Sequence, residues 1–163
     1  MEYTEERRNK KGRIFSINCS KTKGVSKEAV KKGRLIENFG LEQDAHSGPG
    51  LKQVSLLAIE SIKKQTQCPK AKKKGITLGP GDFAENITTE GLNLAQLHIG
   101  AKVKVGKEAM LEISRIGKEC HKYCAVYQQE GDCIIPREGI FAKVVKGGEM
   151  AVGDEIEVVN NEK

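Results

Sequence analysis

The chain has 163 residues, a length that suits one compact domain. Hydrophobic residues make up 37% of it, but there is no Trp and only 4% of the residues are aromatic. The core must therefore be built from Ile, Val, Leu and Ala, which favours β-rich packing. The net charge of +6 comes from the N-terminal region: residues 1–35 hold 11 basic and 4 acidic side chains, whereas residues 36–163 hold 17 basic and 18 acidic ones. Single-stranded nucleic acid is a disfavoured partner of this basic region, because the chain has few aromatic side chains on which bases could stack. The chain has no apolar run of the roughly 20 residues that a membrane span needs, so we predict no membrane partner. It has no signal-peptide hydrophobic region, and its five cysteines are clustered, so we predict a reducing, cytoplasmic compartment.

The sequence of the N-terminal half predicts a short flexible leader followed by strands, a loop and a helix. Residues 1–11 are predicted as a flexible basic leader and residues 12–163 as one domain, because the leader offers almost no apolar surface to offset the entropy of ordering. The expected elements in chain order are a strand over Arg13–Asn18, a Gly/Pro-rich loop over Gly40–Gly50, a buried strand over Gln53–Leu57 and a short helix over Ala58–Gln65.

The C-terminal half is punctuated by glycines at regular intervals. The strands expected there are Phe83–Ile87, Lys102–Val105, Ala109–Ile116, Ile140–Val145 and Glu155–Val159. Gly147–Gly148 and Gly153–Asp154 read as a pair of turns, and a second short helix is expected over His121–Gln129. Short strands at this spacing predict a mainly β fold, a barrel or sandwich with few helices.

Three of the five cysteines, Cys120, Cys124 and Cys133, fall in one segment together with basic residues. Positive neighbours such as Lys118, His121 and Arg137 favour the thiolate, which is the form that attacks electrophiles, carries sulfur or binds a soft metal. Three interpretations stay open: a zinc site, although the C-x3-C-x8-C spacing has no paired C-x2-C, three inert buried cysteines, or one functional thiolate tuned by its neighbours. We favour the third.

A second polar group surrounds the Gly/Pro-rich loop. Asp44, His46, Lys52 and Gln53 place an acid, an imidazole, a cation and an amide within about ten residues. Either these are ordinary surface or hydrogen-bonded residues, or they bind a ligand that the glycine-rich backbone lets approach closely. The segment from Gly81 to Thr89 has a similar polar character.

The order of these motifs resembles the MOSC domain, named from the C-terminal domain of molybdenum cofactor sulfurases. The resemblance is carried by Gly40-Leu-x-x-Asp44-Ala-His46, Lys52-Gln-Val-Ser-Leu56, Gly81-Asp-Phe-Ala-Glu-Asn86-Ile, Gly117-Lys-x-Cys120-His121 and Gly153-Asp154. It runs from about Gly12 to Val159 and is greatest to the small stand-alone bacterial branch. Two positions depart from the family pattern, namely Gln43 where glycine is common and Lys52 where arginine is common.

The resemblance implies a strongly bent, β-barrel-like fold with a few helices and a cleft for the molybdenum–pterin cofactor. Cys120, with Cys124 as second choice, would be the functional thiol, either a sulfur carrier or a molybdenum ligand. The implied cofactor-binding residues are Asp44, His46, Lys52, Gln53, Asn86, Lys118 and Arg137.

Mechanism and partners follow from the same resemblance. Sulfur handling implies molybdenum cofactor biosynthesis proteins, or a cysteine desulfurase as sulfur donor, as partners, and no pyridoxal phosphate is expected in this chain itself. The alternative is a molybdenum-dependent reductase of N-hydroxylated compounds, which would need a separate electron donor because this chain has no redox module of its own. A zinc or nucleic-acid binding module is the third class considered.

Overall fold

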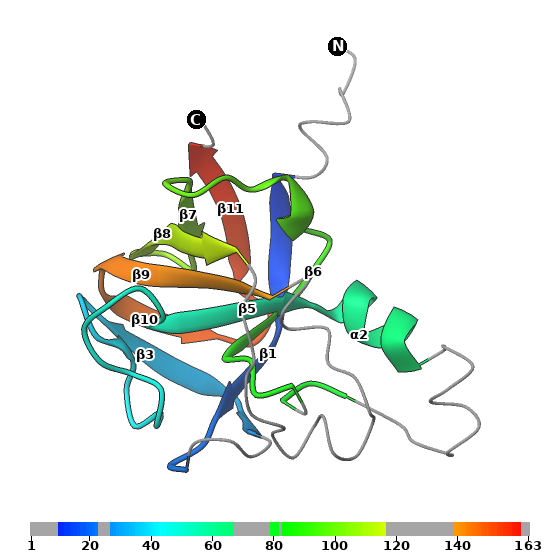
Figure 1. Cartoon of the computed structure of the whole chain (residues 1–163), viewed down its shortest axis with the longest axis horizontal. Coiled ribbons are helices and arrows are strands. Elements are labelled where there is room, and N and C mark those ends of the chain that lie inside the picture. Colours follow the sequence, from blue (N-terminus) through cyan, green and yellow to red (C-terminus); the bar gives the residue numbers. More distant parts are fainter. Residues whose placement is uncertain (1–9, 23–26, 67–78, 82, 117–138, 161–163) are drawn as a thin grey trace.

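The structure is a computed structural model and describes residues 10–22, 27–66, 79–81, 83–116 and 139–160. Within these residues, seven strands close into a barrel (Figure 1). Their order around the barrel is β1 (Lys11–Cys19), β6 (Ile87–Glu90), β5 (Val54–Ala58), β9 (Ile140–Lys146), β8 (Ala109–Ile116), β7 (Lys102–Val105) and β11 (Glu155–Asn160). The ring closes because β11 also pairs with the start of β1. Neighbouring strands are antiparallel except β5 and β6, which are parallel.

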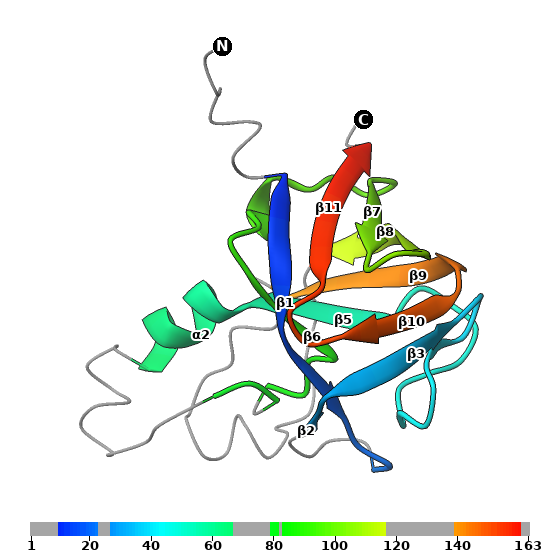
Figure 2. The same ribbon diagram turned by 180° about the vertical axis from the view of Figure 1, so that it is seen from behind.

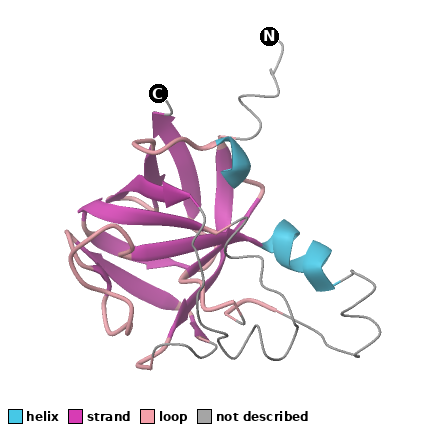
Figure 3. Cartoon of the chain, viewed as in Figure 1, coloured by secondary structure: helices cyan, strands magenta, loops and turns pink. Residues whose placement is uncertain are grey.

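Smaller elements extend this barrel. Strand β1 is long and kinked by an irregularity between Ile14 and Ser16, and its far end pairs with β2 (Glu28–Val30). A second sheet consists of β10 (Gly148–Ala151), β3 (Lys32–Ile36) and β4 (Gly40–Leu41), and the rear view shows β3 and β10 side by side (Figure 2). One α-helix, α2 (Ile59–Thr66), and one 3-10 turn, η1 (Leu94–Gln96), are the helical elements of the described residues (Figure 3).

The core follows directly from the side-chain pattern of the strands. In β8, Ala109, Leu111 and Ile113 point into the barrel and alternate with more exposed residues, as a half-buried strand requires. Strand β5 is buried along its whole length. It lies between β6 and β9 in the barrel, and α2 continues from its end and contacts β5 and β6. The core is aliphatic, as the composition predicts: Ile, Val, Leu and Ala make up almost all of the cluster that fills the barrel.

The predicted fold class is confirmed: the protein is mainly β and barrel-shaped, with very few helices. The expected strands at Lys102–Val105 and Ala109–Ile116 match β7 and β8 residue for residue. Strand β1 begins at Lys11, the last residue of the predicted leader, and residues 1–9 lie outside the described part of the chain. In the described residues, no helix is long and apolar enough to span a membrane.

Two predicted elements were wrong. The strand expected over Phe83–Ile87 begins only at Ile87, because the backbone N–H of Ala84 bonds to the carbonyl of Gly81 in a turn and Ala84 has a positive φ of 63°. Of the predicted pair of turns, the one at Gly147–Gly148 is wrong, because Gly148 is the first residue of strand β10. The one at Gly153–Asp154 is confirmed, and Gly153 has the positive φ of 95° that favours glycine. The helix expected over His121–Gln129 lies outside the described residues.

Candidate functional site

A small cavity of ≈ 70 Å³ opens on the outer side of β5 and β9. Three parts of the chain form its walls: the loop before β5, the turn before β6, and the strands β5 and β9 themselves. Its lining residues are His46, Lys52, Ser55, Phe83, Ala84, Asn86 and Phe141. The structure therefore brings together three residues predicted for cofactor binding that are separated by as many as 40 positions, namely His46, Lys52 and Asn86.

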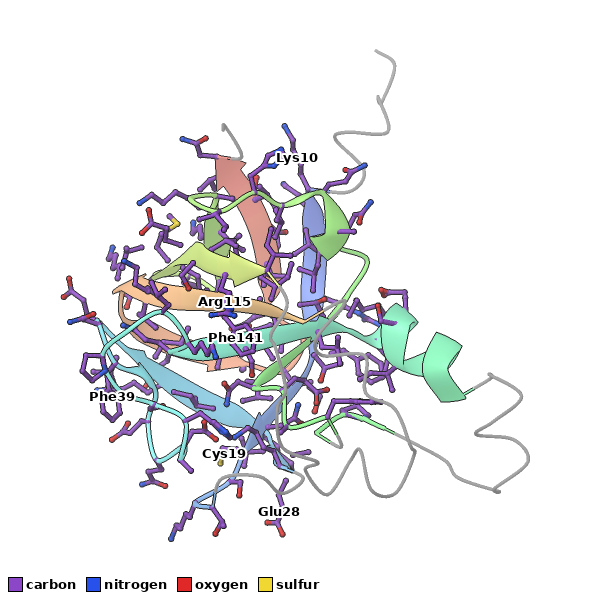
Figure 4. All side chains as sticks on the ribbon, viewed as in Figure 1. Lys10, Cys19, Glu28, Phe39, Arg115 and Phe141 are labelled. Carbon is purple, nitrogen blue, oxygen red and sulfur yellow. The ribbon has the colours of Figure 1, made fainter. Side chains whose placement is uncertain are left out.

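Lys52 supplies a cation to the edge of this cavity. Its Nζ lies 5.8 Å from the centroid of the Phe141 ring, within the range of a cation–π interaction. Phe141 lies on β9 near the middle of the molecule (Figure 4). The aromatic ring thus holds a positive charge beside the cavity, where it can attract an anion.

Asn86, which follows the turn before β6, fixes that turn against β5. Its Oδ1 accepts hydrogen bonds from the backbone N–H of Ser55 at 3.0 Å and from the Ser55 hydroxyl at 3.2 Å. Its Nδ2 donates to the carbonyl of Asn18 at 3.4 Å, which ties the same turn to β1. Asn86 is 1% exposed, so these bonds are made in the interior, where an unpaired amide would be costly.

A buried Lys–Asp–His cluster supports one wall of the cavity. Lys27 Nζ lies 2.7 Å from Asp44 Oδ1 and 2.9 Å from His46 Nδ1, and the side chains of Lys27 and Asp44 are both 0% exposed. Asp44 also accepts hydrogen bonds from the backbone N–H groups of Ser20 at 3.0 Å and His46 at 3.1 Å. The distance between His46 Nδ1 and Asp44 Oδ2 is 3.9 Å, too long for a hydrogen bond. His46 is thus positioned through Lys27 on its ring and through Asp44 on its backbone.

The ionised form of Asp44 is stabilised by this cluster. Burial by itself would raise the pKa of this carboxyl group, because a buried charge loses its hydration. The hydrogen bonds from Lys27, the Ser20 backbone and Asn86, together with the positive charge of Lys27, outweigh burial and lower the pKa of Asp44 below its usual value. Asp44 is therefore an anion at neutral pH, and its role is to hold Lys27 and the loop.

Comparison with known proteins identifies the family. The family model described as the MOSC domain matches residues 42–157, which include the whole cavity. The chain belongs to the MOSC domain family. This family is associated with molybdenum cofactor binding. No curated protein matches the sequence.

Solved structures support the same fold for this MOSC domain. The YuaD protein from Bacillus subtilis is 19% identical, with a TM-score of 0.73 over 91% of this chain and 95% of that chain. YiiM from Escherichia coli is 18% identical, with a TM-score of 0.67 over 93% of this chain and 71% of its own. YiiM from Geobacillus stearothermophilus is 20% identical, with a TM-score of 0.67 over 91% and 75%. At these identities the likeness concerns the fold alone.

In this MOSC domain, the side chain of Gln53 lies apart from the cavity. Its Oε1 accepts from the backbone N–H of Val144 at 2.9 Å, and its Nε2 donates to Asn38 Oδ1 at 2.9 Å and to the Gly50 carbonyl at 3.2 Å. The side chain is completely buried and does not line the cavity that Lys52, the preceding residue, lines. These contacts give Gln53 the function of tying the loop of residues 38–50 to β9.

Sequence reasoning did not single out Lys27 or Glu85. Lys27 belongs to a basic stretch that reads as exposed, and no local pattern reveals that its partners lie 17 and 19 residues further along the chain. Glu85 is 0% exposed and accepts a hydrogen bond from the Thr88 hydroxyl at 2.8 Å, and its Oε1 has no hydrogen-bond partner. Burial raises the pKa of Glu85 to about 7, although hydrogen bonds from Thr88 and nearby backbone groups oppose this.

The predicted thiol and part of the predicted anion site lie outside the described residues. These are Cys120, Cys124, Lys118 and Arg137, together with Cys133 and His121 of the alternative zinc site. The described residues themselves contain no group of three or more His, Cys, Asp or Glu side chains placed to hold a metal ion. The only cysteine that the structure describes, Cys19, is a partly buried free thiol.

Proposed function

We propose that this MOSC domain binds the molybdenum–pterin cofactor, holds an anionic group of it in the cavity beside Lys52 and His46, and uses Cys120 to carry sulfur or to ligate molybdenum. One observation carries the proposal. The stretch that contains Cys120 joins the end of β8 to the start of β9, and Phe141, the second residue of β9, lines the cavity. Phe141 pairs with Arg115 of β8 on one side and with Ser55 of β5 on the other.

The ends of the cysteine-bearing connection support the proposal, because they are next to a residue that lines the cavity. The last residue of β8, Ile116, pairs with Ile140, so the chain leaves the barrel and returns to it at neighbouring positions. Both positions are within two residues of the Arg115–Phe141 pair in the strand register. The sequence segment with the thiol and the cavity with the cation are therefore attached to the same end of one strand pair.

The lining residues fit a small oxyanion. Lys52 offers a cation and His46 an imidazole, which are groups of the kind that bind phosphate. The side chains of Ser55 and Asn86 are hydrogen-bonded to each other and shape the wall of the cavity. The cavity of ≈ 70 Å³ is smaller than the roughly 300–1,000 Å³ of a pocket that encloses a drug-sized ligand. The described residues would therefore hold one group of the cofactor, its phosphate, and not the whole molecule.

When bound, the cofactor supplies the molybdenum centre, and the chain's own residues bind and orient it. As a sulfur carrier, Cys120 would be loaded by thiol–persulfide exchange: its thiolate attacks the terminal sulfur of a donor persulfide, a new S–S bond forms, and the donor leaves as a thiolate. This exchange needs no oxidant or reductant. A cysteine desulfurase that carries a persulfide would be a donor of the right chemical class.

The content of the purified protein tests the proposal. We expect protein from a host that makes the cofactor to contain a pterin, detected by fluorescence after oxidation, and Lys52→Ala to lower that content about tenfold, as loss of one charge-assisted hydrogen bond predicts. Lys104→Ala, at an exposed position of β7, is the matched control and should retain the wild-type content. Cys120→Ser should retain the pterin but lose sulfane sulfur or molybdenum.

The same measurement separates the alternatives. Sulfane sulfur without molybdenum would support the carrier, and one molybdenum per chain that is lost in Cys120→Ser would support the metal ligand and the reductase. Wild-type protein that holds zinc but neither pterin nor molybdenum would contradict the proposal and favour the zinc module.

Alkylation tests the thiol itself. Iodoacetamide near neutral pH should label Cys120 faster than Cys19 or Cys68, because the basic neighbours of Cys120 favour its thiolate. Cys19 serves as an internal reference, since it is a free and partly buried thiol. Peptide mass spectrometry gives the labelling rate of each cysteine. Slow labelling of Cys120 in protein with neither metal nor persulfide attached to it would argue against its assignment.

A further inference from the structure

Lys27 joins two segments that build the cavity wall. Its backbone N–H donates to the carbonyl of Gly81 at 2.8 Å, and its Nζ reaches Asp44 at 2.7 Å and His46 at 2.9 Å. The contact with Gly81 is close, because a Cβ on that glycine would lie 2.2 Å from the carbonyl oxygen of Lys27, and its φ is +88°. Lys27 is thus held by its backbone to the turn before β6 and by its side chain to the loop before β5.

The chemistry of an ammonium group determines the state of the His46 ring. A lysine ammonium has three donors and no acceptor, so a ring nitrogen 2.9 Å from Nζ has to be the acceptor. A neutral imidazole with an acceptor at Nδ1 carries its single proton at Nε2. The buried charge of Lys27 also needs an anion to balance it, and Asp44 supplies this anion, with its Oδ1 2.7 Å from Lys27 Nζ.

We propose that Lys27 is a positioning residue that fixes His46 as the neutral Nε2–H tautomer, so that the cavity offers an imidazole N–H donor to an oxyanion. The nature of the anion rests on the proposed function, whereas the tautomer of His46 does not. The arrangement suits an acceptor-rich ligand, since phosphate and other oxyanions accept hydrogen bonds and a bare acceptor nitrogen would repel them.

Removal of Lys27 would reverse the tautomer of the His46 ring. His46 Nδ1 would then face Asp44 Oδ2, 3.9 Å away, with no cation between them. A carboxylate beside a ring nitrogen favours a proton on that nitrogen, as in the carboxylate–histidine pairs of many sites. The proton should therefore move to Nδ1, and the neutral ring would present an acceptor at Nε2.

Long-range proton–nitrogen NMR of ¹⁵N-labelled protein at neutral pH measures the tautomer. The chain has three histidines, and the His46 signals are assigned as those lost in His46→Gln. We expect a pyridine-type nitrogen at Nδ1 and a pyrrole-type nitrogen at Nε2 in the wild type. Lys27→Arg, which keeps a donor-only cation, should retain this pattern, and Lys27→Met should shift the proton to Nδ1. Lys31→Met, at an exposed lysine, should change nothing.

The wild-type spectrum is decisive without any variant. A proton on Nδ1 in the wild type, or a doubly protonated ring, would overturn the inference, as would an unchanged tautomer in Lys27→Met. Titration with inorganic phosphate then tests the use of the donor: we expect the His46 signals to shift, with about tenfold weaker binding in Lys27→Met. An Nε2–H tautomer with no response to phosphate would support the role of Lys27 and count against the proposed function.

Discussion

Lys27→Met is expected to lower the free energy of unfolding by about 3–5 kcal/mol, because it leaves the Asp44 carboxylate buried without its partner charge. Both side chains of the pair are 0% exposed and their charged atoms are 2.7 Å apart. Urea unfolding at pH 7, followed by circular dichroism because the chain has no Trp, measures the loss. A loss below about 1 kcal/mol, the range of surface pairs, would show that the pair is not buried in solution.

A surface ion pair provides the control. Arg34 and Glu149 lie 3.1 Å apart, but their side chains are 57% and 79% exposed, so Arg34→Met should cost less than about 1 kcal/mol. At acid pH, the difference in free energy of unfolding between the wild type and Lys27→Met should become smaller. The folded-state pKa of Asp44 is lowered, so the stability that its ionised form contributes is present at neutral pH and is lost as the pH falls below the usual value of 3.8.

Glu85 is expected to give the opposite pH dependence. Its folded-state pKa is raised from 4.5 to about 7, so folding favours the protonated carboxyl group. The corresponding stability is fully present below pH 4.5 and is lost as the pH rises through about 7. A shift of this size corresponds to roughly 3 kcal/mol at about 1.4 kcal/mol per pKa unit.

Glu85→Gln isolates this contribution. The amide cannot ionise, so we expect the decline in stability between pH 5 and pH 8 to be much shallower in the variant than in the wild type. Urea unfolding across that range, with the exposed residue Glu28 changed to Gln as a control, makes the comparison (Figure 4). Parallel pH profiles for wild type and Glu85→Gln would mean that Glu85 ionises normally and that its surroundings are more polar than the structure indicates.

The buried network around Glu85 explains why its charged form is only partly supported. Ser16 donates to Asn18 at 2.7 Å, Asn18 donates to Thr88 at 3.0 Å, and Thr88 donates to Glu85 Oε2 at 2.8 Å. All donors of this chain point toward the carboxylate, which favours its ionised form. They reach one oxygen, while Oε1 is buried without a partner, and burial has the larger effect.

Elements with an alternating pattern could be predicted from the sequence, and elements defined by polar contacts could not. β7 alternates polar and apolar side chains over its whole length, so its boundaries follow from the residues alone. The segment of residues 83–86 begins with Phe83 and Ala84, so its sequence looks like part of a strand. Its backbone is instead turned at Ala84, which has a positive φ of 63°, and it is held by the Asn86 side chain, which bonds to Ser55, 31 positions earlier. No local pattern contains that information.

The candidate site divides in the same way. The sequence pointed to His46, Lys52 and Asn86, because polar residues on a glycine-rich loop and turn suggest a ligand, and the fold does bring them to one cavity. It grouped Gln53 with them through adjacency to Lys52. The side chain of Gln53 instead bonds to Asn38 and to the backbone of Val144, contacts with distant residues that adjacency in the sequence does not reveal. The buried position of Lys27 depends on contacts between loops and has no sequence signature.

The pairing of β11 with β1 has a consequence for how the protein folds. The barrel is closed by the first and last strands of the described chain, through pairs such as Lys11 with Glu157 and Arg13 with Glu155. Contacts between such distant residues slow folding, because the entropy of closing a long loop is lost before the contacts form. During synthesis on the ribosome, β1 and β7 therefore keep unpaired edges until the last strand has emerged. These unpaired edges are sites at which the nascent chain can aggregate until β11 is available to cover them.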